Sequence, residues 1–266
     1  MKHYFIFLKK ELLESVKTFK LLIMGAVFLF FGMLSPLTAR FTPQILQWVF
    51  ENDSSVDEAT RALFETVFAE PAALDSWTEF FSNIGLMGLV VTVIIFAGML
   101  SSELKAESGG TLTIILTKGI SRASVLLAKI TSAMLIWTVS LAASALTCYG
   151  YTVYMFDGAI PNILFGVFCM WVFGIFLLAL TALFAAATRK SYVCMMFVGA
   201  VAIVLRIINL TPSIAKYNPV SLLEWGHGVM SETVEIAKTY PSMIVAGVCA
   251  GGLVGAAVML FGKRKL

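Results

Sequence analysis

Long apolar stretches alternate with polar segments along almost the whole chain. Six of these stretches hold the roughly 20 residues that an α-helix needs to cross about 30 Å of hydrocarbon. The predicted spans cover about residues 19–39, 80–100, 125–154, 160–187, 192–210 and 242–261. We therefore expect an all-α integral membrane protein with six transmembrane helices, in which residues 1–266 form one transmembrane domain.

A different periodicity precedes the first span, in residues 1–18. Apolar side chains recur there at spacings of three and four residues, namely at Phe5, Leu8, Leu12, Val16 and Phe19. The other faces carry Lys9, Lys10, Glu14 and Lys17. This pattern predicts an amphipathic helix along the inner membrane interface, with its lysines near anionic headgroups. The helix either anchors the first span only or also contacts a cytosolic partner, and periodicity does not decide between these roles.

Two segments between spans are too long for plain turns. In Arg40–Thr78, two apolar patches predict two short helices that rest on the outer leaflet or cap the bundle. The patches are Ile45, Leu46, Val49 and Phe50, and then Val56, Leu63, Phe64, Val67 and Phe68. In Thr211–Tyr240, the apolar run Val220–Met230 is too short to span and predicts a re-entrant or interfacial helix.

The composition supports a membrane location. Hydrophobic residues make up 59% of the chain and charged residues only 13%, with a mean hydropathy of +0.90. A soluble fold of this size would have to bury more apolar surface than its interior can hold. The formal net charge of +3 gives no reason to expect nucleic-acid binding.

The distribution of basic residues predicts the orientation. Most of the 19 lysines and arginines fall in segments that a six-span chain places on one side: Lys2, Lys9, Lys10, Lys17, Lys20, Lys105, Lys118, Arg122, Lys129, Arg189, Lys190, Lys263, Arg264 and Lys265. Basic loops stay in the cytoplasm. We therefore expect a multi-pass protein of the plasma membrane with both termini cytoplasmic, and an N-terminal span that is retained rather than cleaved.

No motif for catalysis or nucleotide binding is present. The sequence lacks GxxxxGK[ST] and HExxH, and no Ser-His-Asp or Cys-His set is indicated. His3 and His227 lie far apart, which disfavours a metal site. The four cysteines lie in apolar stretches without a CxxC pair, so we interpret them as small buried residues. We predict no enzyme activity, cofactor or metal in this chain.

Arg206 is the clearest ionisable residue within a predicted span, near the outer end of 192–210. One interpretation is that its long side chain reaches the outer headgroups. The other is that it contacts a ligand or anion in a cavity of the transport pathway. We favour the first interpretation.

The last span carries a stripe of small residues, Gly247, Gly251 and Gly255, with Gly252 adjacent. Small residues let membrane helices approach closely. We expect packing within the chain, and an interface between subunits is the alternative.

The segment between the second and third spans, residues 101–122, has the features of a short amphipathic helix with charged flanks. Acidic Glu103 and Glu107 precede a Gly109-Gly110 break, an apolar stretch and a Lys-Gly-Ile-Ser-Arg sequence. Such a helix can sit in a groove on a cytosolic protein and transmit its movement to two spans. An ordinary loop is the alternative.

The pattern E-x-x-x-E-S-G-G-T-L followed by S-R and K, from Glu103 to Lys129, resembles the first cytoplasmic loop of ABC-2-type transporter permeases. Lys9–Glu14 resembles the amphipathic N-terminal helix of that family, and Asn218-Pro219 resembles its external re-entrant region. The likeness in layout extends over nearly the whole chain. The sequence departs from the family at an additional Gly109, and at Lys118-Gly119, where many members have proline. These departures bear on the geometry of the loop rather than on its role.

The resemblance implies the transmembrane subunit of an ABC transporter that forms an export pathway. It implies a cytosolic ABC ATPase and a second permease subunit, identical or paralogous, as partners within the lipid bilayer. In the family, the loop between spans two and three is a coupling helix, and the N-terminal helix borders the ATPase. The residues assigned to coupling in this way are Glu103, Glu107, Gly110, Thr111, Leu112, Arg122, Glu11 and Glu14.

Three other classes of function compete with this interpretation. An intramembrane enzyme is disfavoured because the spans lack paired acids or histidines. A secondary transporter would show buried carboxylates and broken spans at mid-membrane. A receptor or scaffold without ATPase coupling is compatible with the sequence. The substrate is not readable, although apolar spans suit a hydrophobic peptide, a lipid-linked molecule or a drug-like compound.

Overall fold

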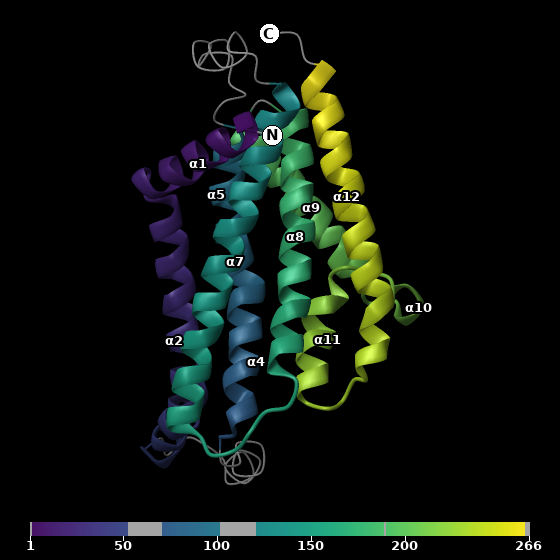
Figure 1. Cartoon of the computed structure of the whole chain (residues 1–266). Helices are drawn as coiled ribbons and strands as arrows, with labels where there is room; N and C mark the ends of the chain where they lie inside the picture. The colour runs from purple at the N-terminus through teal and green to yellow at the C-terminus, as the bar shows by residue number, and fades with distance from the viewer. Residues whose placement is uncertain (1, 53–70, 102–120, 189, 264–266) are drawn as a thin grey trace.

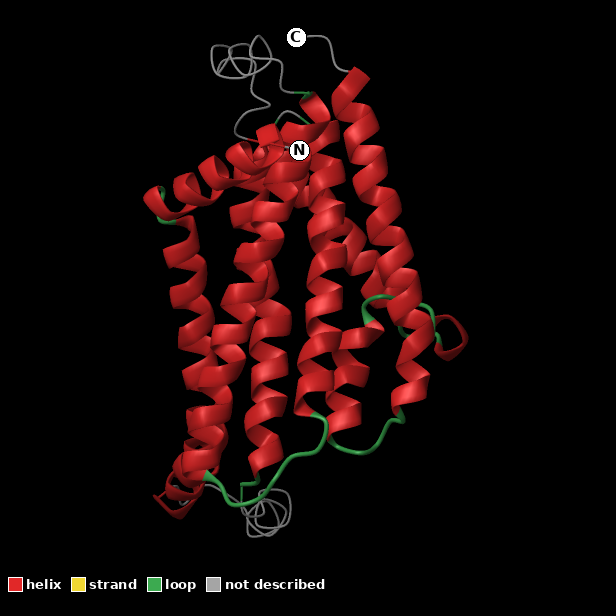
Figure 2. Cartoon of the chain, in the orientation of Figure 1, coloured by secondary structure: helices red, strands yellow, loops and turns green. Residues whose placement is uncertain are grey.

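The computed structural model describes residues 2–52, 71–101, 121–188 and 190–263, and this part of the chain is helical throughout apart from turns and loops (Figures 1 and 2). Its helices are α1 (Lys2–Lys17), α2 (Lys20–Asn52), α4 (Ala73–Asn83), the π-helical η1 (Ile84–Gly88), α5 (Leu89–Ser101), α7 (Arg122–Met155), α8 (Ile163–Ala187), α9 (Ser191–Ile208), α10 (Pro212–Ala215), α11 (Ser221–Met230), the 3₁₀-helical η3 (Ile236–Thr239) and α12 (Tyr240–Lys263).

Six helical stretches are long and apolar enough to cross a membrane, which confirms the predicted number of candidate spans. They are α2, the continuous α4–η1–α5, α7, α8, α9, and η3 with α12. The longest of them run side by side as a bundle, and α1 lies across one end of that bundle (Figure 1).

Helix α8 forms the centre of the bundle and packs against α12, α11, α5, α7 and α9. It is apolar on every side, as expected for a helix with neighbours all round. Gly174 allows the indole of Trp137 on α7 to lie against its backbone, since a Cβ atom there would come within 2.2 Å of the ring. Trp137 is fully buried and meets Phe28 of α2 edge-on, with 5.6 Å between the ring centroids.

Helices α2 and α7 also approach closely. The Ser144 hydroxyl donates to the Phe28 carbonyl at 2.6 Å, and a Cβ atom at Gly32 would lie 2.6 Å from the Ser144 carbonyl oxygen. A small residue and a hydroxyl at the same crossing are typical of helix pairs in lipid, where close packing and polar contacts replace the hydrophobic effect.

Helix α2 differs from the predicted first span. A separate short helix was expected around Ile45–Phe50, but α2 continues to Asn52 through Pro36 and Pro43. Proline is tolerated inside membrane helices because neighbouring groups satisfy the freed backbone. The second expected helix, at residues 56–68, lies outside the described residues.

The glycine stripe of α12 does not pack against any of the residues that the structure describes, contrary to expectation. A Cβ atom at Gly247, Gly251 or Gly255 would meet no atom within 4 Å, and Cys249 on the same helix is exposed, unlike the other three cysteines. The buried side of α12 carries Ser242, Ala246, Ala250, Ala257 and Phe261. Both stripes consist largely of small residues, so spacing alone did not identify the one that faces α8.

The run predicted as a short helix, Val220–Met230, forms α11. It packs along α8, and a Cβ atom at Gly166 would come within 2.5 Å of the Met230 sulfur and 3.0 Å of the Gly226 carbonyl oxygen. Helix α11 is not one of the six candidate spans.

Candidate functional site

Helix α1 is joined to α2 by a tight turn at Thr18–Phe19. The Thr18 amide and hydroxyl both donate to the Glu14 carbonyl, at 2.8 and 2.7 Å. Phe19 has φ of 58°, a left-handed conformation that is uncommon for a residue with a side chain. This turn lets α1 lie across the end of the bundle, where it packs mainly on α7 (Figure 1).

The face of α1 that packs on the bundle matches the predicted apolar set only in part, since Leu8 packs against the core and Leu12 is partly buried. Phe7, Glu11 and Ser15 are buried, and the Tyr4 hydroxyl donates to Thr131 Oγ1 on α7 at 2.7 Å. Phe5, by contrast, is 63% exposed, and Val16 and Phe19 are also exposed. The helix itself is present as expected, but a polar residue occupies the centre of its buried side.

Glu11 forms a buried ion pair with Lys129 of α7. The Lys129 ammonium donates to Glu11 Oε2 at 2.8 Å, and the side chains are only 4% and 2% exposed. Burying two charges costs several kcal/mol for each ion in a real protein, so they must pair closely. The contact spans 118 positions in the sequence and joins the N-terminal helix to the third span.

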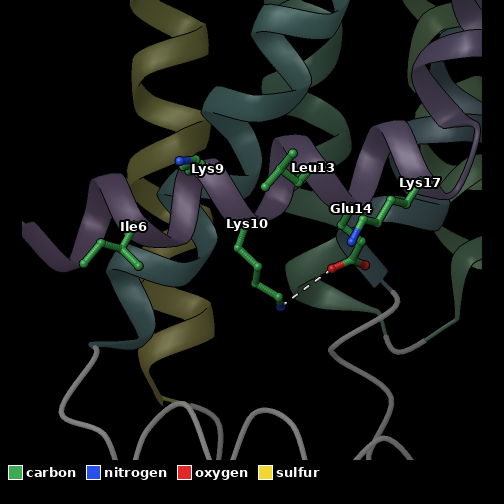
Figure 3. Close-up of a pocket in the computed structure, with 6 residues that line it drawn as sticks. All are labelled: Ile6, Lys9, Lys10, Leu13, Glu14 and Lys17. Carbon is green, nitrogen blue, oxygen red and sulfur yellow. Dashed lines mark ion pairs between the residues drawn. The ribbon is translucent and has the colours of Figure 1, made fainter.

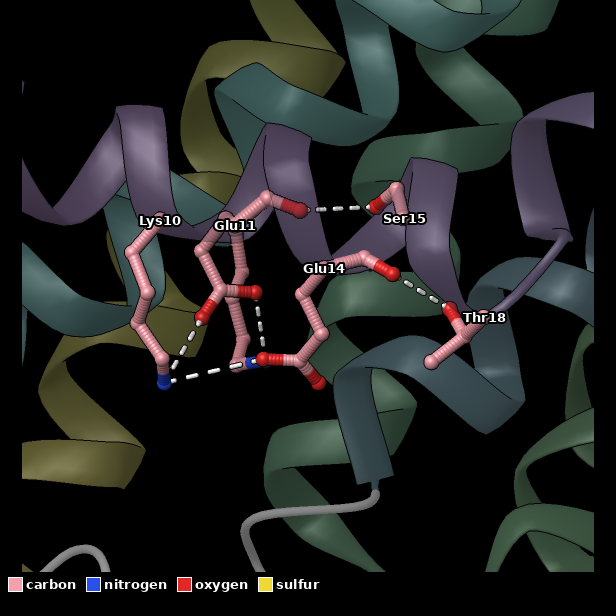
Figure 4. A network of polar contacts seen from close by, with 6 residues as sticks. Lys10, Glu11, Glu14, Ser15 and Thr18 are labelled. Atoms are coloured by element: carbon pink, nitrogen blue, oxygen red, sulfur yellow. Dashed lines mark hydrogen bonds and ion pairs between the residues drawn. The ribbon is translucent and has the colours of Figure 1, made fainter.

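Lys10 lies between the two carboxylates that the family resemblance assigned to coupling. Its ammonium is 3.6 Å from Glu11 Oε1 and 3.6 Å from Glu14 Oε2 (Figure 4). Lys10 and Glu14 are partly exposed, so their pair contributes about 0.5 kcal/mol or less. The structure therefore brings Glu11 and Glu14 together, but buries one and leaves the other at the surface.

The outward side of α1 carries a groove of about 420 Å³ (Figure 3). Its lining residues are Ile6, Lys9, Lys10, Leu13, Glu14 and Lys17. Ile6 and Leu13 are exposed apolar side chains, and three lysines surround them. A basic surface with apolar anchors suits an acidic protein surface or anionic headgroups.

Helix α7 begins at Arg122, shortly before the predicted start of the third span at about residue 125. Ser121 caps the helix, since its side chain accepts from the Ser124 amide at 3.2 Å, and Arg122 is the first residue of α7. The other residues assigned to coupling, Glu103, Glu107, Gly110, Thr111 and Leu112, lie outside the described residues.

Arg206 does not stand alone on α9. Its Nη1 atom is 3.0 Å from Glu224 Oε1 on α11, and the Asn209 side-chain amide donates to Glu224 Oε2 at 2.9 Å. The side chains of Arg206 and Glu224 are 60% and 50% exposed. Nearby, the Asn218 side chain donates to the Leu205 carbonyl at 2.7 Å. These contacts tie the end of α9 to the segment that leads into α11.

His227 makes a further polar contact between α11 and a neighbouring helix. Its Nε2 atom lies 2.8 Å from the Thr78 hydroxyl of α4, and its ring meets Phe81 edge-on. Burial lowers the pKa of His227 below its usual 6.5. Within the described residues, no group of three His, Cys, Asp or Glu side chains could hold a metal ion.

Sequence reasoning missed Lys129 and Glu224 as partners. Lys129 was counted among the basic residues of the cytoplasmic side, although it falls inside the predicted third span. The sequence does show a charged residue about two turns into an otherwise apolar helix. Such a residue needs a partner of opposite charge, so its position could have predicted an ion pair. Glu224 is the corresponding signal in the run Val220–Met230.

Comparison with known proteins matches the chain to one protein family. A family model described as an ABC-2 family transporter protein matches residues 5–219, which run from α1 to just before α11. No curated protein matches the chain. The matched range holds Glu11, Lys129 and Arg206, and Glu224 follows it.

Proposed function

Because the chain belongs to the ABC-2 transporter family and is the membrane component of an ABC transporter, we propose that it forms an export pathway driven by a separate cytosolic ATPase. The 266 residues contain no nucleotide-binding motif, so hydrolysis falls to a partner. ABC-2 permeases generally pair with ABC ATPase subunits. A second permease subunit, identical or paralogous, completes the pathway.

The ATPase docks at the end of the bundle where α1 lies. Support comes from the basic groove of α1, and from the end of α5 and the beginning of α7, which lie at this same end (Figure 1). Residues 102–120 connect those two ends and carry the acidic and apolar pattern of a coupling helix. In this arrangement Arg122 and Glu14 border the docking site, and Glu11 acts from the interior.

The α1 end of the bundle faces the cytoplasm of the cell, and the membrane is the plasma membrane. Lys9 and Lys17 belong to α1, and Arg122, Lys190 and Lys263 belong to helix ends or connections on this side. The connections at the other end carry acids, among them Asp75, Asp157, Glu232 and Glu235. Basic residues next to spans favour the cytoplasmic side.

Helices α10 and α11 form an external re-entrant region between the fifth and sixth spans. Its support is the short length of α11, its packing along α8, and the return of the chain through η3 into α12 (Figure 1). A helix of this length cannot cross the bilayer, and it gains from packing on a span.

The observation that carries the proposal is the family match across residues 5–219 together with six candidate spans. The test begins with purification of the tagged chain from its native membrane and identification of the ATPase that accompanies it. Glu103→Lys/Glu107→Lys should strongly reduce co-purification and substrate-stimulated hydrolysis in reconstituted membranes, because these acids belong to the coupling pattern.

The matched control is Glu232→Lys/Glu235→Lys, which makes the same charge change at the other end of the bundle and should leave co-purification unchanged. Equal co-purification in both variants, and in Glu103→Lys/Glu107→Lys with an added Leu112→Asp, would refute this coupling site. Transport driven by an ion gradient in vesicles without ATPase would instead identify a secondary transporter.

A further inference from the structure

Stability alone does not explain the Glu11–Lys129 ion pair. Both side chains are almost completely buried, and their charged atoms are 2.8 Å apart. Replacing a buried ion pair by apolar residues of similar volume often leaves a protein equally stable or more stable. A buried pair does, however, accept only a narrow geometry, because the attraction that offsets the cost of burying the two charges depends on close contact.

A second polar contact joins the same two helices. The Tyr4 hydroxyl donates to Thr131 Oγ1 at 2.7 Å. Tyr4 and Glu11 are two turns apart on α1, about 10 Å along its axis. Two separated contacts hold the direction of α1 relative to α7, which a single contact would not do.

The attachment of α1 to the rest of the bundle is uneven. It packs mainly on α7 and only lightly on α2, to which it is joined through the turn at Thr18–Phe19. Its opposite side carries the basic groove with Lys9 and Lys17 (Figure 3). A force applied to this outward side therefore reaches α7 through the contacts of Tyr4 and Glu11. Helix α7 in turn packs along α2 and α8.

We infer that Glu11 and Lys129 are positioning residues that lock α1 to α7, so that movement of the ATPase against α1 reaches the third span through this pair, in addition to the input proposed for residues 102–120. This inference rests on the proposed function, since it names a second mechanical input to the same permease. Glu11 and Lys129 act through the helices and touch neither nucleotide nor substrate.

The lock can be measured in the permease alone. Tyr4→Cys and Thr131→Cys are introduced with Cys249→Ser, which removes the exposed native cysteine, and a short bifunctional thiol reagent reports the α1–α7 distance. Glu11→Leu/Lys129→Met should keep the melting temperature and slow cross-linking about tenfold, as expected for neighbours with a substantial interaction energy. The charge-swapped Glu11→Lys/Lys129→Glu should recover part of the rate. Glu14→Leu, on the exposed side, should leave it unchanged.

An unchanged cross-linking rate in Glu11→Leu/Lys129→Met would overturn the inference. If that variant does not fold, Glu11→Gln/Lys129→Gln takes its place, because two amides retain a polar contact. Failure of both to fold would also overturn it, since the pair would then be a contact needed for folding.

The consequence for transport is measured in the complex with the ATPase. Glu11→Leu/Lys129→Met should still co-purify with the ATPase but transport several-fold less substrate for each ATP hydrolysed. Cross-linking of positions 4 and 131 should restore the amount of substrate transported for each ATP hydrolysed. If this amount already equals the wild-type value before cross-linking, transmission from α1 to α7 through Glu11 and Lys129 is refuted. If the wild-type chain binds no ATPase, the proposed function fails, whereas the cross-linking rate still decides whether the pair locks α1 to α7.

Discussion

At the scale of single residues, burial determines how much an ion pair contributes to the stability of the protein. Glu11 and Glu14 lie one turn apart on α1 and both have a lysine within 4 Å. Glu11 is shielded from solvent, so its charge depends on the nearby ammonium groups of Lys129 and Lys10. Glu14 is partly exposed and remains solvated without Lys10. The two carboxylates, which are indistinguishable by residue type, therefore make different contributions to stability.

Substitution of each glutamate by leucine should separate these contributions. Glu11→Leu removes the carboxylate 2.8 Å from Lys129 and should destabilise the protein by about 3–5 kcal/mol. Glu14→Leu should change stability by about 0.5 kcal/mol or less. Thermal unfolding in detergent, followed by size-exclusion chromatography, should give a clearly lower melting temperature for Glu11→Leu only. Equal melting temperatures would contradict the burial of this pair.

Glycines on two spans should respond differently to an added methyl group. Gly174→Ala places a Cβ atom 2.2 Å from the Trp137 ring, so the helices must shift, at a cost of about 1–3 kcal/mol. Gly251→Ala meets no atom within 4 Å in the described chain and should leave the fold unchanged. The melting temperature and the tryptophan emission of the two variants check this difference. A destabilised Gly251→Ala would indicate that another helix covers this side of α12.

At the scale of the elements, polar contacts hold α11 in place between α9 and α4. Glu224 meets Arg206 of α9, and His227 meets Thr78 of α4. The apolar side of α11 packs on α8 through Gly226 and Met230. Because α11 is only 10 residues long, such tertiary contacts rather than helix propensity must stabilise it.

The Arg206–Glu224 pair should tolerate a change of cation but not a reversal of charge. Arg206→Lys keeps a positive charge that can reach Glu224 or the outer headgroups, and should retain transport. Arg206→Glu places two carboxylates together and should reduce transport, and Arg206→Glu/Glu224→Arg should restore it. Transport at equal membrane abundance is the measurement. Loss of transport in Arg206→Lys would instead point to a specific guanidinium contact.

The contact of His227 with Thr78 should weaken in acid. Burial lowers the pKa of His227 below 6.5, so packing of α11 favours the neutral ring. The stability from this neutral contact is present above pH 6.5 and is lost as the pH falls from there through the lowered pKa. The melting temperature should therefore fall further between pH 7.5 and pH 5 in the wild type than in His227→Asn. An equal fall in the melting temperature of the wild type and of His227→Asn would exclude His227 as the cause.

At the scale of the whole molecule, the six candidate spans alternate in direction, so the connections fall at two ends of the bundle. One end carries α1 and the connection between α8 and α9, and the other carries the connection between α7 and α8 (Figure 1). The orientation in the membrane then follows from a single labelled position at each end.

Single cysteines test this orientation. Asp157→Cys and Lys190→Cys lie at opposite ends and are exposed, and Cys249→Ser removes the exposed native thiol. On intact cells, an impermeant thiol reagent should label position 157 and not position 190, since basic connections remain in the cytoplasm. Labelling after permeabilisation controls for reactivity at 190. The reverse pattern would invert the proposed topology.

The sequence by itself determined the features that depend on local composition. The number of candidate spans and the helical class follow from apolar length, because the hydrocarbon thickness sets a minimum for each crossing. The amphipathic periodicity likewise predicted the helix at residues 2–17, and the predicted third span at 125–154 lies within α7. The family resemblance, which the match over residues 5–219 confirms, also rests on patterns along the chain.

Only the tertiary structure decided which faces of those helices meet. In water the apolar side of a helix points inward, but in a bilayer lipid covers apolar side chains as well as protein does. Phe5 and Val16 of the predicted apolar set therefore proved to be exposed, while Glu11 turned inward to Lys129. For the same reason α12 packs through Ala246 and Ala250 rather than Gly251. Contacts such as Glu11–Lys129 join residues 118 positions apart, and only the packing of whole helices brings them together.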